Sequence, residues 1–414
     1  MKGTKDLLII NIDSISGICT GGQELKKGKE MSMVTSYSDA WLLVEKGRIH
    51  SWGSMQEIPE YSGKILDANG GFILPTWCDS HTHIVYAGSR EQEFVMRLKG
   101  KSYEEIAEAG GGILNSAKVL RITPEELLYQ NAAERVLEVM QMGTGAIEVK
   151  SGYGLTTDSE LKILRVIKKL KSDFPIHIKS TFLGAHAIPT EFKDNRKEYI
   201  RKITDEMLPK IADEGLADYI DVFCDNGFFT VEETDYILKA GMNYGLKAKI
   251  HANELANSGG VQVGIANNAI SVDHLEMIEE AEINALSQSN TIPTVLPSVS
   301  FFLRIPYAPA RKMIDSGLGI AMASDYNPGS SPSGNIPLLM GIACHKMKIT
   351  PGEAFNAVTI NGACAMELQS DLGSITAGKW ANLIITKPIP SLAYIPYQFG
   401  SNHIYKVLIK GEEV

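Results

Sequence analysis

Short apolar runs alternate with helix-like stretches through the middle of the chain. Most runs are short and rich in β-branched residues, as parallel strands buried on both faces are. Eight of them predict strands, at residues 72–79, 146–150, 176–183, 219–224, 248–251, 270–274, 291–296 and 319–324. Between several strands a Thr is followed three residues later by Glu, a helix-start signal, at residues 123–126, 157–160 and 230–233. Eight strands with intervening helices favour an α/β fold of the (β/α)8 type, the TIM barrel, with a doubly wound open sheet as the alternative.

The two ends of the chain differ from the middle. Short strands separated by Gly, Ser and Lys are predicted near both termini, at residues 7–12, 40–44, 48–52, 381–386 and 405–409. Two strand-rich ends that flank a long middle indicate one small β unit assembled from both termini. Periodicity predicts the strands, but it does not predict how the two ends pair.

Composition and charge narrow the function classes. The 414 residues include 40 Lys and Arg against 49 Asp and Glu, a net charge of −9. This balance argues against nucleic acid as the main partner, because phosphate binding needs a basic face. No uncharged apolar run is long enough to span a membrane, and the apolar patch at residues 7–10 is too short for a signal peptide, so we expect a cytoplasmic protein. The five cysteines are widely spaced without a CxxC pair, which argues against a disulfide framework and a zinc ribbon.

Histidines and one aspartate gather at the predicted strand ends. Barrel enzymes carry their chemistry at the carboxyl ends of strands. His81 and His83 lie two residues apart at the end of the first strand, so both side chains point to the same side. His251 ends the fifth strand and Asp325 follows the eighth. Imidazole and carboxylate ligands that leave a position open for water are typical of a single catalytic metal ion.

Three acid–base groups accompany the predicted metal site. Asp325 can accept the proton of a water activated by the metal, Glu254 can face the substrate, and His274 can hydrogen-bond a developing oxyanion or the nucleophile. Each residue also has a plain structural interpretation: Asp325 as a turn former, Glu254 as a solvated loop acid, and His274 as a core histidine bound to backbone.

Other residues at the same strand ends suit a polar ligand. Arg90 follows the first strand and could hold a carboxylate with two hydrogen bonds, or lie on the surface. Tyr153 stands between glycines after the second strand, and His186 follows the third. The segment 327–330, with Asn327, Gly329 and Ser330, follows Asp325, and glycine lets a ligand approach the backbone.

These residues together resemble the amidohydrolase superfamily. The superfamily resemblance rests on His81, His83, His251, His274 and Asp325. A narrower resemblance, to the branch that hydrolyses 4-imidazolone-5-propanoate in histidine degradation, rests on six segments in order: HTHIVYAGSR (81–90), AGGGIL (109–114), EVKSGYG (148–154), TFLGAHAIP (181–189), DVFC (221–224) and SDYNPGS (324–330).

The resemblance implies a barrel over residues 71–373 and a small β-sandwich domain from residues 1–70 and 374–414. It implies that a metal-bound water attacks the ring carbonyl, opens the cyclic amide C–N bond and yields N-formimidoyl-L-glutamate. The implied metal, one zinc or iron ion, would be held by His81, His83, His251 and Asp325. The implied substrate contacts are Arg90, Tyr153, His186, Glu254, Asn327, Gly329 and Ser330. The implied catalytic residues are Glu254, His274 and Asp325.

Two other functions share parts of this pattern. A purine or pyrimidine deaminase of the same superfamily would share the metal ligands, Glu254 and His274, whereas Arg90 and Tyr153 suit a substrate that carries a carboxylate. A catalytically dead barrel used for binding is the other alternative, and the intact set of ligands argues against it. The expected partner is a small-molecule substrate, with neither nucleic acid nor membrane; a homodimer is allowed but not defined by the sequence.

Overall fold

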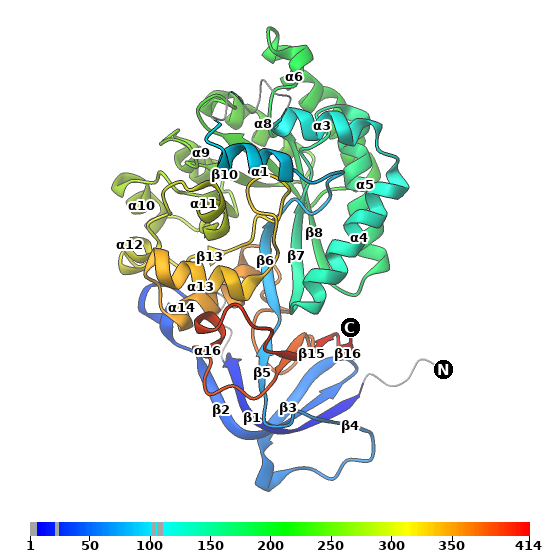
Figure 1. The fold of residues 1–414 in the computed structure, drawn as a ribbon, viewed down its shortest axis with the longest axis vertical. Helices are drawn as coiled ribbons and strands as arrows, with labels where there is room; N and C mark the ends of the chain where they lie inside the picture. The colour runs from blue at the N-terminus through cyan, green and yellow to red at the C-terminus, as the bar shows by residue number, and fades with distance from the viewer. Residues whose placement is uncertain (1–5, 21–24, 102–104, 106–110) are drawn as a thin grey trace.

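A computed structural model describes residues 6–20, 25–101, 105 and 111–414, and Figure 1 shows a barrel above a smaller sheet. The barrel sheet contains eight parallel strands in the order β13-β12-β11-β10-β9-β8-β7-β6. Their bounds are β6 Trp77–Thr82, β7 Thr144–Lys150, β8 His177–Ala185, β9 Tyr219–Cys224, β10 Lys247–Ala252, β11 Ser271–His274, β12 Ile292–Val295 and β13 Ala321–Met322. The segment after β13 returns to β6, where His83 N donates to Tyr326 O at 2.9 Å and Asp325 N donates to His81 O at 2.9 Å.

The predicted barrel is confirmed, with one correction at its first strand. Residues 72–79 form two strands: β5 (Phe72–Pro75) pairs with β1 and β14 in the smaller sheet, and β6 continues into the barrel. Thr76 lies between them, and its N–H donates to Asn382 O at 3.1 Å. Periodicity did not reveal this break because both strands are buried, so the apolar run continues across it.

Helices surround the barrel. Of the three helix starts predicted from the Thr–Glu spacing, one has the predicted cap, one is capped one residue earlier, and one has no such cap. The capping box at Thr230 is present at the start of α8 (Val231–Asn243). The one at residue 157 was wrong by one position, because Thr156 caps α5 (Thr157–Asp173). At residue 123 the capping box was wrong: α4 (Glu125–Gln141) has Pro124 at its N-cap, and the Thr123 hydroxyl donates to Val119 O of the preceding helix.

The remaining helices lie between and after the strands (Figure 1). Their bounds are α1 Glu91–Leu98, α3 Ile113–Ile122, α6 Arg196–Arg201, α7 Leu208–Glu214, α9 Gly260–Ala266, α10 Glu280–Ser287, α11 Pro297–Leu303, α12 Ala310–Asp315, α13 Ile336–Met347, α14 Pro351–Ala357, α15 Ile360–Cys364 and α16 Tyr394–Tyr397. None of the described helices is both long enough and apolar enough to cross a bilayer.

Strands from both termini build the smaller sheet. Its order is β16-β15-β14-β5-β1-β2-β3, with β4 paired to β1. The strands are β1 Leu7–Ile18, β2 Thr35–Glu45, β3 Arg48–Ser54, β4 Lys64–Asp67, β5, β14 Leu383–Thr386, β15 Ile404–Ile409 and β16 Glu412–Glu413. The sheet has its own cluster of buried apolar residues, and Ile49 N in β3 donates to Lys379 O, shortly before β14, at 2.9 Å. The predicted fold class is confirmed; the division at residues 70/71 and 373/374 stays a prediction.

His177, at the start of β8, couples stability to pH. Burial, Lys410 and Arg48 lower the pKa of His177 to about 4, against the opposing effect of Asp371. Between pH 6.5 and 4 the unfolded chain binds a proton that the folded chain does not, so the free energy of unfolding falls as the pH falls. At about 1.4 kcal/mol per pKa unit, we expect His177→Asn to reduce this acid loss by about 1–3 kcal/mol. Urea unfolding at pH 7 and pH 4.5 measures it, and an equal acid loss in both proteins would contradict it.

Candidate metal centre and active site

Three histidine nitrogens meet at the carboxyl end of the barrel. His81 is the second-last residue of β6, His83 directly follows that strand, and His251 lies in β10. The Nε2 atom of His83 lies 3.3 Å from that of His81 and 3.4 Å from that of His251. All three side chains are buried. The i, i+2 spacing of His81 and His83 therefore brings both rings to the barrel interior, as the alternation of strand side chains requires.

Asp325 joins this cluster. Its Oδ1 lies 3.3 Å from His81 Nε2 and 3.4 Å from His83 Nε2. Tetrahedral ligands bound to zinc at 2.0–2.1 Å are about 3.4 Å apart. Within the described part of the chain Asp325 Oδ1 has no hydrogen-bond partner, although it is buried. The backbone of Asp325 has a φ of 51°, the left-handed region that a non-glycine residue adopts at some cost.

The donor set fits one divalent metal ion. Burial lowers the pKa of His81, His83 and His251, so all three imidazoles are neutral, which is the form that binds a metal. Burial also raises the pKa of Asp325 to about 8, with a further contribution from Glu254. A cation beside Asp325 would relieve this electrostatic cost. The buried orphan oxygen, the neutral imidazoles and the spacing of the donors are together consistent with a metal site.

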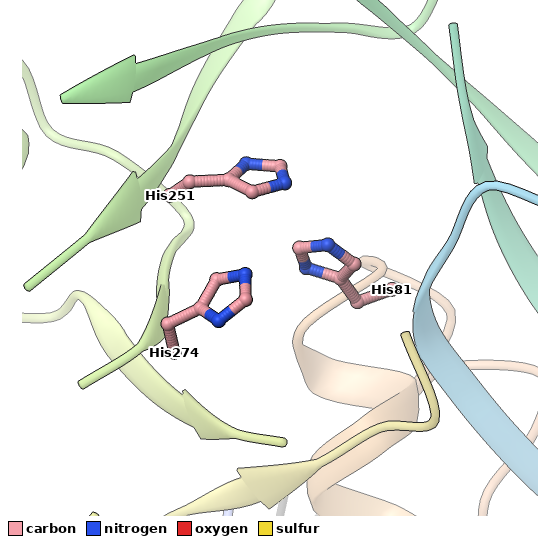
Figure 2. A group of neighbouring side chains, drawn as sticks. All are labelled: His81, His251 and His274. Carbon is pink, nitrogen blue, oxygen red and sulfur yellow. The ribbon is translucent and has the colours of Figure 1, made fainter. Parts of the chain in front are cut away.

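His274 lies close enough to form a second possible ligand set. Figure 2 shows the rings of His81, His251 and His274 turned toward one another from three strands, and each offers a nitrogen within 4.8 Å of the others. His274 Nδ1 faces two carboxylates, Glu254 and Glu276, each at 3.6 Å. Burial alone would lower the pKa of His274, but these carboxylates raise it to about 10. A protonated imidazole is a poor ligand, which separates His274 chemically from the other histidines.

Two carboxylates that the sequence analysis did not single out orient the histidines. Asp273 Oδ2 lies 2.7 Å from His81 Nδ1, and Asp221 Oδ2 lies 3.0 Å from His251 Nδ1. Such a partner holds the proton on Nδ1 and leaves Nε2 free to bind a metal. The signal was present in the sequence, because a charged residue inside an otherwise apolar buried strand needs a partner.

A network of buried ions lies below the histidines inside the barrel. Lys150 Nζ contacts Glu148 Oε1 at 2.5 Å, Asp221 Oδ2 at 2.8 Å and Asp273 Oδ2 at 3.6 Å. Lys249 forms an ion pair with Glu148 as well. Burial alone would lower the pKa of Lys150, but the three carboxylates raise it above its ordinary value, so Lys150 is charged.

A cavity of about 550 Å³ opens above the cluster. Its described lining includes the predicted substrate residues, Arg90, Tyr153, His186, Glu254, Asn327, Gly329 and Ser330, together with apolar side chains such as Phe94, Phe223 and Phe302. Arg90 Nη2 lies 2.5 Å from Glu93 Oε2 beside the cavity. His186 stacks on His83 with ring centroids 5.3 Å apart, and burial lowers its pKa to about 3. A cavity that combines apolar walls with charged side chains suits a small polar ligand.

Asn327 and Ser330 also contact the candidate metal ligand. Asn327 Nδ2 donates to Asp325 Oδ2 at 2.8 Å, and the Ser330 hydroxyl donates to the same oxygen at 3.2 Å. Asn327 Oδ1 accepts from Gly329 N at 2.7 Å and Ser330 N at 2.9 Å, which closes the turn. These bonds occupy Oδ2 and leave Oδ1 facing the histidines.

The sequence model of the Amidohydrolase family matches residues 72–414. The chain belongs to the amidohydrolase family. Among its amidohydrolase relatives, an imidazolonepropionase of Flavobacterium johnsoniae is 54% identical over 413 residues, covering 100% of this chain and 98% of that protein. An imidazolonepropionase of Thermoanaerobacter pseudethanolicus is 41% identical, covering 97% of this chain and 96% of that protein.

Solved structures with the same fold are more distant. Escherichia coli guanine deaminase superposes with a TM-score of 0.74 at 14% identity, covering 100% of this chain and 99% of that chain. An adenosine deaminase of Xanthomonas campestris with bound zinc superposes with a TM-score of 0.71 at 15% identity, covering 99% and 92%. At this identity the likeness concerns the fold alone.

Proposed function

We propose that this chain hydrolyses 4-imidazolone-5-propanoate to N-formimidoyl-L-glutamate. The observation that carries the proposal is its 54% identity, over the full length, to a protein named imidazolonepropionase. The site geometry supports it, because neutral imidazoles and a carboxylate lie at the floor of a cavity that has an arginine in its wall. The deaminases share the fold, but at 14–18% identity they give no support for deamination here.

A single zinc or iron ion, held by His81, His83, His251 and Asp325, is the proposed cofactor. When bound, such an ion lowers the pKa of a coordinated water toward neutrality and polarises a carbonyl. The residues around it divide the remaining work. Asp325 keeps an oxygen toward the floor of the cavity, where it can accept a proton from the nucleophile. Borderline nitrogen and oxygen ligands accept both metals, so elemental analysis of the purified protein decides between them.

Glu254 and His274 form the proposed proton-transfer pair. Glu254 lines the cavity, and burial raises its pKa to about 7 while His274 opposes the shift. A carboxyl group with a pKa near the working pH can take a proton and return it within one turnover. We assign Glu254 to accept the second proton of the attacking water, after Asp325 has taken the first, and to deliver it to the ring nitrogen as the C–N bond breaks. The protonated His274 stabilises negative charge on the carbonyl oxygen.

Arg90 is the proposed partner of the propanoate tail, with Tyr153 and His186 as further contacts in the cavity wall. Its guanidinium is held by Glu93, and charge-assisted hydrogen bonds from it could orient a carboxylate. The protein carries a net negative charge, but the positive charge of Arg90 lies in the cavity wall, where it can attract an anionic substrate.

Adding a methyl group at Gly329 tests this assignment. A Cβ at residue 329 would lie 2.1 Å from Arg90 Nη1, so the guanidinium must move. Since hydrogen bonds to charged groups contribute about 1.5–3 kcal/mol, we expect Gly329→Ala to raise KM by about 10-fold or more. Gly88→Ala is the matched control, because a Cβ there has nothing within 4 Å. Steady-state kinetics measure both; an unchanged KM in Gly329→Ala would argue against Arg90 as the tail partner.

Incubation of the purified, metal-loaded protein with the imidazolone tests the function. We expect the imidazolone absorbance to decrease and N-formimidoyl-L-glutamate to accumulate. No loss of absorbance with metal-loaded protein would reject the proposal, and ammonia release from guanine or cytosine would favour a deaminase instead. Absence of bound metal by elemental analysis would revive the interpretation as a binding protein.

We propose a cytoplasmic location and a small molecule as the partner, without nucleic acid or membrane. Light scattering after size exclusion would test for a homodimer.

A further inference from the structure

Lys150 connects two of the candidate metal ligands from below. It lies in β7 with its side chain fully buried inside the barrel. Its ammonium reaches across the interior to Asp221 in β9 and Asp273 in β11. Among the described ion pairs, no other lysine or arginine contacts both of these carboxylates.

The same carboxylate oxygens contact Lys150 and the histidines. Asp221 Oδ2 lies 2.8 Å from Lys150 Nζ and 3.0 Å from His251 Nδ1. Asp273 Oδ2 lies 3.6 Å from Lys150 Nζ and 2.7 Å from His81 Nδ1. The ammonium of Lys150 is therefore linked through one carboxylate to His251 and through another to His81, on two different strands.

The other oxygens of these carboxylates are also held. Asp221 Oδ1 accepts from His251 N at 3.1 Å, and Asp273 Oδ1 accepts from the Ser271 hydroxyl at 2.6 Å. Both oxygens of each carboxylate therefore have a polar contact. Among the described contacts, the ammonium of Lys150 is the one that Asp221 and Asp273 have in common. Removing it would leave one side of each carboxylate without its cation, and the plane of the carboxylate sets the plane of the imidazole.

We propose that Lys150 is a positioning residue for the metal centre: it fixes Asp221 and Asp273 so that Nε2 of His251 and of His81 point at one place. This inference rests on the proposed function only in assuming that these histidines bind a metal ion. Its test measures metal binding without substrate, so a different reaction at this site would leave the inference standing.

Lys249 supplies the matched control. Its side chain is also fully buried, and it forms an ion pair with the same Glu148. Its other described hydrogen bonds go to the backbone carbonyls of Ser80 and Ala365, at 3.3 and 3.2 Å, and its ammonium lies 5.4 Å from the centroid of the Tyr219 ring. A lysine that only stabilises the barrel interior would behave as Lys249 does. A lysine that positions the metal ligands would differ from it in metal affinity.

The experiment compares zinc affinity in Lys150→Met and Lys249→Met by competition with a chromophoric chelator. We expect Lys150→Met to weaken zinc binding by about 10–100-fold, the range for lost partners of metal-bound histidine. We expect Lys249→Met to keep its affinity to within about 2-fold, because among the described ion pairs Lys249 contacts neither Asp221 nor Asp273. The visible spectrum of bound Co²⁺ should change in Lys150→Met alone. Native affinity in Lys150→Met, or an equal loss in both variants, would overturn the proposal.

A double-variant cycle tests the route through the carboxylates. If Lys150 acts through Asp221, the loss in Lys150→Met combined with Asp221→Asn is smaller than the product of the two single losses. Losses that multiply would show that Lys150 does not act through Asp221. Should Lys150→Met fail to fold, Lys150→Gln decides the question: it keeps a polar but neutral group, one bond shorter than lysine, inside the barrel, and native affinity for zinc would reject the role of the ammonium.

Discussion

Asp325→Asn is expected to lower kcat/KM for the imidazolone by about 10⁴-fold, because general-base catalysis alone contributes about 10²–10⁴ and the proposed metal ion would also lose an anionic ligand. The carboxylate is the anionic member of the candidate donor set, at 3.3 Å from His81 Nε2 and 3.4 Å from His83 Nε2. An amide keeps the shape of the side chain, but it neither accepts the proton of water nor balances the charge of a cation.

Kinetics, elemental analysis and urea unfolding together measure this effect. We expect the variant to purify with less metal and to remain slow when zinc or iron is added in excess. Its free energy of unfolding should not fall, because the buried carboxylate it replaces has a pKa that burial raises to about 8. Turnover within tenfold of the native protein would remove Asp325 from both assigned roles.

The barrel could be predicted because its strands are buried on both faces. Seven of the eight predicted strands each overlap one barrel strand, as β9, predicted at residues 219–224, illustrates, and the eighth, at residues 72–79, overlaps both β5 and β6. The error at residues 72–79 has a physical cause: β5 and β6 belong to different sheets, but both are covered by apolar side chains. Hydrophobic periodicity reports burial, and it does not report which sheet buries a strand.

The pairing of the two termini required long-range information. β5 pairs with β14, which lies about three hundred residues further along the chain, and Ile73 faces Ile385 across that ladder. No local pattern near either segment encodes such a partner. Strand propensity therefore predicted both segments, but their pairing depends on contacts between residues far apart in the chain.

The candidate site could be predicted in part for a similar reason. His81, His83 and His251 stand at strand ends, where a barrel brings distant residues together. Their carboxylate partners were missed as partners because Asp221 and Asp273 lie on strands of their own, and only the barrel geometry places them beside the imidazoles.

The sequence does contain a signal for this ionic network: charged residues two positions apart within predicted buried strands. Glu148 and Lys150 lie two residues apart in β7, and Lys249 and His251 lie two residues apart in β10. Each pair points into the barrel, because alternate side chains of a strand share a face. Charged residues inside a barrel require partners of opposite charge, so such pairs on several strands predict an ionic network.

Glu254→Gln is expected to lower kcat by about 10²–10⁴-fold with little change in KM, the contribution typical of a positioned acid–base group. The residue lines the cavity, and its carboxylate lies 3.6 Å from His274 Nδ1. The pKa of Glu254 is about 7, and a base acts in its ionised form, so kcat/KM of the native protein should fall as the pH drops below about 7. His274, with a pKa of about 10, stays protonated through this range, so it does not contribute to the fall of kcat/KM at low pH, the acid limb of the profile. The glutamine variant should therefore show a low rate without the acid limb.

Glu276→Gln is the matched control for this prediction. Glu276 faces His274 Nδ1 at the same 3.6 Å, but it is absent from the described lining of the cavity, whereas Glu254 is part of it. Both substitutions remove one negative charge beside His274, so an effect that acts only through the charge of His274 would be equal in the two variants. An effect that depends on contact with the substrate would appear in Glu254→Gln and be about tenfold or less in Glu276→Gln, in line with a lost hydrogen bond. Retention of the acid limb in Glu254→Gln would assign that limb to another group and remove Glu254 as the base.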